Sequence, residues 1–186
     1  GIPADPDLVF LTDGASKGVQ AVLRLLVDGP ADGVLVPIPQ YPLYSASITL
    51  LSGAQVPYFL DEGREWSLSR DVLETAHAEA AARGIRVRAI AVINPGNPTG
   101  AVLDEGNVAM VLDFARVHGL AVLADEVYQE NVYRAGDRFV SFASTLVRRG
   151  IADVPLFSFH SASKGFLGEC GHRGGYLEAR NVSPAV

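Results

Sequence analysis

The feature that most constrains the fold is an alternation of short apolar runs with longer segments of helical spacing. The short runs are rich in β-branched residues and predict strands at 9–12, 34–37, 55–60, 89–94, 120–125, 155–160 and 175–179. Between them, apolar residues at helical spacing predict helices at 18–27, 44–51, 69–83, 104–117 and 139–149. Strands that alternate with helices in this way are typical of an α/β fold with a largely parallel sheet.

The expected sheet lies in the middle layer of a three-layer sandwich. Residues 89–93 are apolar at every position, as is typical of a strand that helices cover on both faces. Only about a dozen residues, many of them glycine, separate the last two strands, and a parallel crossover of that length is barely possible. We therefore expect one domain with a seven-stranded, mostly parallel sheet whose last strand runs antiparallel.

Composition and charge argue against several classes of protein. The chain has 186 residues, 48% of them hydrophobic, which is enough for one folded core. The chain has 15 Lys and Arg but 21 Asp and Glu, and it contains no basic run. This charge distribution argues against nucleic-acid binding. The single cysteine, Cys170, and four scattered histidines predict no disulfide and no metal site. No apolar run reaches the ~18 residues of a membrane-spanning helix, so we expect a soluble protein.

Polar residues follow the carboxyl ends of several expected strands, which is where open α/β sheets bind ligands. Residues 13–16 combine the end of a strand, a glycine and the start of a helix. The free N–H groups at Ala15 and Ser16 would therefore suit a phosphate. The alternative is an ordinary helix start, which has the same pattern. Tyr41 and Asn97 lie in proline-rich loops, where turn formation alone also explains them.

Asp125 ends a strongly apolar strand, and Tyr128 follows one turn later if the chain coils there. A carboxylate buried at this position is unfavourable unless a cation pairs with it. Such a carboxylate would contact a cationic ligand, or alternatively cap a following helix.

Lys164 and Arg173 follow the sixth strand among small residues and glycines. A desolvated lysine has a lowered pKa and can attack a carbonyl, whereas the alternative is a lysine on a surface loop. Arg173 could bind a phosphate with two N–H groups, or lie exposed at a hairpin. Three further arginines, Arg83, Arg86 and Arg88, are interpreted as a solvated rim.

Together these residues, all expected at strand ends, match the needs of pyridoxal phosphate. Its phosphate needs a helix N-terminus and an arginine, its ring nitrogen a carboxylate, its ring oxygen hydrogen-bond donors, and its aldehyde a lysine. The chain also resembles the fold type I pyridoxal-phosphate aminotransferases, within them the alanine aminotransferase group that includes the glutamate:glyoxylate aminotransferases. The segments that carry the resemblance are LTDGAS at 11–16, PIPQYPLYS at 37–45, VINPGNPTG at 92–100, ADEVYQEN at 124–131 and SKGFLGECG at 163–171.

The resemblance implies a role for each candidate residue. Lys164 would bond to the cofactor aldehyde and carry the substrate proton, and Asp125 would pair with the ring nitrogen. Tyr128 and Asn97 would hydrogen-bond the ring oxygen, and Tyr41 would stack on the ring. The phosphate would be held by Ala15, Ser16, Ser161 and Arg173.

The resemblance further implies the large domain, residues 1–186, of the aspartate aminotransferase-like fold. Members of the family are longer homodimers with an N-terminal segment and a C-terminal small domain, so this segment alone is not expected to be active. Expected substrates are alanine or glutamate with 2-oxoglutarate, pyruvate or glyoxylate, and family members occur in cytoplasm, mitochondrion or peroxisome. The alternatives are a non-catalytic dimerisation or scaffold remnant and a fold type I lyase. A nicotinamide enzyme is disfavoured because the Gly-x-Gly-x-x-Gly motif is missing.

Overall fold

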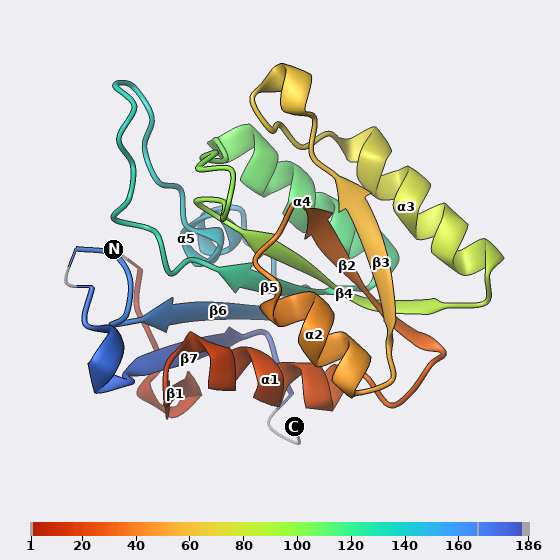
Figure 1. Cartoon of the computed structure of the whole chain (residues 1–186), viewed down its shortest axis with the longest axis horizontal. Coiled ribbons are helices and arrows are strands. Elements are labelled where there is room, and N and C mark those ends of the chain that lie inside the picture. The colour runs from red at the N-terminus through yellow and green to blue at the C-terminus, as the bar shows by residue number, and fades with distance from the viewer. Residues whose placement is uncertain (1, 167, 184–186) are drawn as a thin grey trace.

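The computed structural model describes residues 2–166 and 168–183, and its centre is one sheet (Figure 1). Over the described residues the sheet has seven strands in the order β1-β7-β6-β5-β4-β2-β3. They are β1 (Val9–Thr12), β2 (Asp32–Ile38), β3 (Ala54–Phe59), β4 (Arg86–Ile93), β5 (Ala121–Asp125), β6 (Leu156–Ser161) and β7 (Gly175–Arg180). All seven expected strands are confirmed. The expected direction of the last is confirmed too, because β7 pairs antiparallel with both β1 and β6 while the other pairs are parallel.

Helices cover both faces of the sheet, which confirms the three-layer sandwich (Figure 1). On one face lie α1 (Ala15–Leu26) and α2 (Leu43–Leu50). On the other lie α3 (Arg70–Ala82), α4 (Glu105–His118) and α5 (Phe142–Arg148). Short 3₁₀ turns occur at Pro6–Leu8, Glu62–Arg64 and Cys170–His172. Within the described part of the chain, no helix is both long and apolar enough to cross a membrane.

The core is divided by the sheet into two apolar layers. Along β4, Ile90 and Val92 pack toward α3, α4 and α5, whereas Ala89, Ala91 and Ile93 pack toward α1 and α2. Burial of both faces explains why residues 89–93 of this strand are all apolar. Polar residues can therefore lie together at the carboxyl edge of the sheet without interrupting either of the two apolar layers.

Capping residues set the helix boundaries and account for the differences from the expected ranges. The side chain of Ser141 accepts a hydrogen bond from the N–H of Ser144, so α5 begins at Phe142 and not at 139. In the same way Ser69 caps α3 and stays outside it. By contrast, α1 begins at Ala15, three residues before the expected start, because Gly14 turns the chain directly into the helix.

The expected solvated rim is confirmed for Arg86, whose side chain is 65% exposed, whereas that of Arg88 is 39% exposed; both arginines also lie beside a buried carboxylate. Asp32, which is 3% exposed at the start of β2, lies 2.7 Å from Arg86 Nη2 and 3.8 Å from Arg88 Nε. The Asp28 N–H and the Arg86 guanidinium hold the pKa of Asp32 below its usual value. A buried carboxylate needs such donors, and the strand pairing that brings them together is not visible in the sequence.

We expect Leu23→Ala to lower the free energy of unfolding by about 2–5 kcal/mol, since Leu23 is 0% exposed under the sheet. The matched control is Leu25→Ala on the same helix, at a side chain that is 60% exposed; its effect should stay within about 0.5 kcal/mol. Urea denaturation measures both variants. Equal losses would contradict the packing of α1 against the sheet.

Candidate active site

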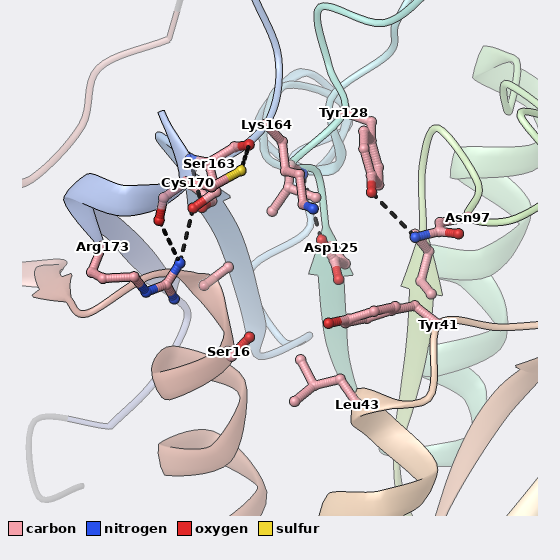
Figure 2. Close-up of a pocket in the computed structure, with 14 residues that line it drawn as sticks. Ser16, Tyr41, Leu43, Asn97, Asp125, Tyr128, Ser163, Lys164, Cys170 and Arg173 are labelled. Atoms are coloured by element: carbon pink, nitrogen blue, oxygen red, sulfur yellow. Dashed lines mark hydrogen bonds between the residues drawn. The ribbon is translucent and has the colours of Figure 1, made fainter. Parts of the chain in front are cut away.

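A cavity of about 220 Å³ lies at the carboxyl edge of the parallel strands (Figure 2). All nine residues that the sequence analysis assigned to a cofactor site line it, namely Ala15, Ser16, Tyr41, Asn97, Asp125, Tyr128, Ser161, Lys164 and Arg173. The other lining residues are Leu43, Ile93, Val127, Ser163 and Cys170. Because β7 runs antiparallel, its first residue lies at this edge, and Arg173 just before it reaches the cavity. A cavity below the ~300–1,000 Å³ of drug-sized sites suits a compact ligand better than a dinucleotide.

One end of the cavity is formed by the N-terminus of α1. Its N-cap, Gly14, has φ +72° and no side chain that could cap the helix. A Cβ on Gly14 would collide with the Arg173 guanidinium, and one on Gly175 would lie 2.9 Å from Ala15 N. Glycine at these two positions therefore lets the arginine and β7 approach the first turn of α1, where uncapped N–H groups favour an anion.

The Arg173 guanidinium lies at the same end (Figure 2). Its Nη1 donates to Ser163 Oγ at 3.0 Å and to the Cys170 carbonyl at 3.3 Å. Its Nε lies 3.4 Å from an Asp13 carboxylate oxygen. Ser161 supports this cluster, since its Oγ accepts a hydrogen bond from Ser163 N at 3.1 Å. A guanidinium beside a helix N-terminus is suited to bind a phosphate.

Asp125 lies in the middle of the cavity, between this cluster and the Asn97–Tyr128 pair (Figure 2). Its side chain is 5% exposed and accepts hydrogen bonds from Tyr44 Oη at 3.0 Å and Val127 N at 3.5 Å. Burial raises the pKa of Asp125 to about 6, although these donors and the Lys164 charge act in the opposite direction. Residues 127–130 form a turn and not a helix, so the alternative of a helix cap is wrong. This carboxylate is suited to bind a cationic ligand group.

The opposite end of the cavity carries hydrogen-bond donors. Asn97 Nδ2 donates to Tyr128 Oη at 3.2 Å, which joins the loop after β4 to the turn after β5. Lys164 Nζ lies 5.8 Å from the centre of the Tyr128 ring, and Tyr41 lies across the cavity below Asp125 (Figure 2). These side chains line the part of the cavity beside Asp125.

One expectation for Lys164 is wrong. The small neighbours suggested a desolvated amine, but Lys164 is exposed in this chain even though it lines the cavity. Phe166, two residues after it, is 92% exposed.

Sequence reasoning missed two buried polar residues beside Asp125. Tyr44 is 0% exposed and donates to the Asp125 carboxylate. Glu126 is 1% exposed; its Oε1 accepts from Phe142 N at 2.8 Å, and burial raises its pKa to about 7. A polar residue directly after an apolar strand was a usable signal for Glu126. No sequence signal pointed to Tyr44, because its hydrogen-bond partner, Asp125, is 81 residues away.

Over the described residues, no group of three or more His, Cys, Asp or Glu side chains is arranged to hold a metal ion. The charged groups that line the cavity include the Asp125 carboxylate, the Lys164 amine and the Arg173 guanidinium.

Comparison with known proteins identifies the family. The family model for aminotransferase class I and II matches residues 1–183. The chain belongs to the aminotransferase class I and II family. It is 51% identical over 189 residues to glutamate–glyoxylate aminotransferase 1 of Arabidopsis thaliana, covering 100% of this chain and 39% of that protein. It is 54% identical over 188 residues to the mitochondrial alanine aminotransferase 1 of the same plant, covering 100% of this chain and 35% of that protein. This aminotransferase chain thus spans less than two fifths of the length of these relatives.

The family resemblance extends to solved structures. The alanine aminotransferase from Pyrococcus furiosus superposes with a TM-score of 0.82 at 30% identity, over 96% of this chain and 42% of that one. The expected aspartate aminotransferase-like fold is thereby confirmed for this class I and II aminotransferase chain.

The raised pKa of Asp125 predicts a pH-dependent effect of Asp125→Asn on the ligand-free protein. Because this pKa is higher in the folded chain than its ordinary 3.8, the folded state binds more protons between that value and about 6. The stability contributed by Asp125 therefore falls as the pH rises through this range. We expect Asp125→Asn to raise the free energy of unfolding by up to about 3 kcal/mol near pH 7.5 and by little near pH 4.

Urea denaturation at both pH values measures this difference, which includes the release of Glu126 from the repulsion by the Asp125 charge that helps raise its pKa. An asparagine variant that is less stable at neutral pH would show that Asp125 is not an unfavourably buried charge.

Proposed function

We propose that residues 1–186 form the pyridoxal-phosphate-binding large domain of a longer aminotransferase. It would transfer an amino group between alanine or glutamate and a 2-oxo acid, namely 2-oxoglutarate, pyruvate or glyoxylate, in a ping-pong cycle. The observation that carries the proposal is that one cavity collects an uncapped helix N-terminus, an arginine, a buried carboxylate and a lysine. The names of the alanine and glutamate–glyoxylate relatives support the substrate class.

The residues present fit the cofactor group by group. Asp125 is a buried carboxylate that accepts hydrogen bonds from Tyr44 Oη and Val127 N, and a protonated ring nitrogen would supply a cation. Arg173 with the first turn of α1 would bind the phosphate, together with Ser161. Tyr128 and Asn97 would hydrogen-bond the ring oxygen, and Tyr41 would cover one face of the ring.

Lys164 would have two tasks. When bound, the cofactor supplies an aldehyde carbon that amines attack and a cationic ring that accepts an electron pair from the substrate. The Lys164 amine would hold the cofactor between turnovers by bonding to that carbon. Once the substrate amine replaces it, the free Nζ would remove the proton from the substrate Cα as a general base and return it as a general acid.

Asp125 and Tyr128 would determine the electrostatics of this step. A carboxylate that is 5% exposed interacts strongly with a cation beside it, so Asp125 would keep the ring nitrogen protonated. Tyr128 Oη, which is held by Asn97 Nδ2, would orient the ring through its oxygen. The exposed Lys164 and Phe166 support the further proposal that the N-terminal segment, the small domain or a second copy in a homodimer completes the site.

The lysine assignment predicts a single labelled residue. These 186 residues contain two lysines, Lys17 and Lys164, so incubation of the full-length protein with pyridoxal phosphate, borohydride reduction and peptide mapping distinguish the two within this chain. We expect the reduced adduct on the peptide that contains Lys164, and Lys164→Ala should abolish both label and transamination. Lys17→Ala, at an exposed position of α1, is the matched control and should leave both intact. An adduct at another residue would refute the assignment.

The phosphate site predicts a change in cofactor selectivity. Arg173→Gln should weaken the binding of pyridoxal phosphate by about 10- to 100-fold, because a charge-assisted contact is lost, while binding of unphosphorylated pyridoxal changes little. Arg24→Gln, at the far end of α1, is the control. Equilibrium titration followed by absorbance measures both ligands. Equal weakening for the two ligands would contradict a phosphate contact by Arg173.

A further inference from the structure

The most informative contact outside the set of assigned residues joins Tyr44 to Asp125. Tyr44 is 0% exposed, and its hydroxyl donates to Asp125 Oδ2 at 3.0 Å across 81 residues of sequence. The other carboxylate oxygen, Oδ1, accepts only a long contact of 3.5 Å from Val127 N. Among the described residues, Tyr44 therefore provides the shortest hydrogen bond to this carboxylate.

Tyr44 lies in α2, directly after a residue of the same helix that lines the cavity. Tyr41 and Leu43, just before and at the start of this helix, line the cavity, whereas Tyr44 points beneath it into the core between α2 and the sheet. A tyrosine hydroxyl has one proton, and here it is directed to Asp125 Oδ2. Because Tyr44 donates to Oδ2 from the core side, the Asp125 carboxylate cannot rotate away from the cavity without losing this hydrogen bond.

The titratable groups around Asp125 come from α2 and from the segments that follow β5 and β6. Tyr44 belongs to α2, Lys164 follows β6, and Glu126 is the next residue of the chain. Tyr58 of β3 lies near Tyr44, but its hydroxyl donates to the Ala91 carbonyl at 2.9 Å and not to the carboxylate. Tyr44 and Tyr58 are thus two buried tyrosines whose hydroxyls donate to different acceptors. The acceptor of Tyr44 is an ionisable carboxylate, whereas the acceptor of Tyr58 is a backbone carbonyl.

We propose that Tyr44 is a positioning residue that holds the Asp125 carboxylate ionised and turned toward the cavity, where it meets the cationic group of the ligand. The inference rests on the proposed function for the identity of that group. Tyr44 itself does not touch the ligand, since it does not line the cavity. Its effect would pass through the orientation and the charge of Asp125.

The first test uses the full-length protein without cofactor. Tyr44→Phe should lower the folding equilibrium constant about tenfold more near pH 7.5, where Asp125 is ionised, than near pH 4.5. Tyr58→Phe, the matched control, should cause a loss that is the same at both pH values, because its acceptor does not titrate. In an Asp125→Asn background, the pH-dependent part of the Tyr44→Phe effect should disappear. A pH-independent loss for Tyr44→Phe, or one that persists beside asparagine, would overturn the proposal.

The second test uses the cofactor. Tyr44→Phe should raise the dissociation constant of pyridoxal phosphate about tenfold and shift the pH dependence of its absorbance, whereas Tyr58→Phe should change the constant less than about threefold. Equal effects of the two variants would also overturn the proposal. Failure of the unmodified protein to bind pyridoxal phosphate would refute the proposed function instead, and the cofactor-free comparison would still decide the role of Tyr44.

Discussion

The proposed chemistry of this chain depends on one carboxylate buried at the end of an apolar strand. Asp125 closes β5, the middle of the sheet, where apolar layers lie on both faces and water is largely excluded. A charge at this position is unfavourable without partners, and burial raises the pKa of Asp125 to about 6. The same burial would make the carboxylate an effective partner for a cation, since electrostatic attraction is strong where water is excluded. The ligand-free fold thus carries an unfavourable interaction that a cationic ligand would relieve.

Sheet topology explains how the other groups reach this carboxylate. The carboxyl ends of β4, β5 and β6 meet at one edge, and the antiparallel β7 brings Arg173 to that edge from the opposite direction. Gly14 and Gly175 then allow α1 to approach so closely that its N-terminus and the arginine lie at one end of the cavity, where an anion is proposed to bind. The cavity is therefore a consequence of strand order and of two glycines, and not of any single motif.

The sequence predicts much of this arrangement for identifiable reasons. Apolar runs such as 89–93 and 120–124 reveal buried strands, and the short, glycine-rich connection before β7 reveals its direction. All nine assigned site residues lie around one cavity because residues at strand ends share an edge, although their individual roles remain proposals. The hydrogen bond of Tyr44 and the ion pairs of Asp32 were not predictable, since each joins residues that only the packed fold brings together. The exposure of Lys164 was missed because small neighbours permit desolvation but do not supply the atoms that cause it.

The central claim is that Asp125 pairs with a protonated ring nitrogen of pyridoxal phosphate. Nitrogen-15 NMR of cofactor labelled at that nitrogen, bound to the full-length protein, tests this directly. The account predicts the chemical shift of a protonated pyridinium throughout the neutral to mildly alkaline range, and its loss in Asp125→Ala. A shift typical of an unprotonated ring nitrogen in the unmodified protein at neutral pH would contradict it.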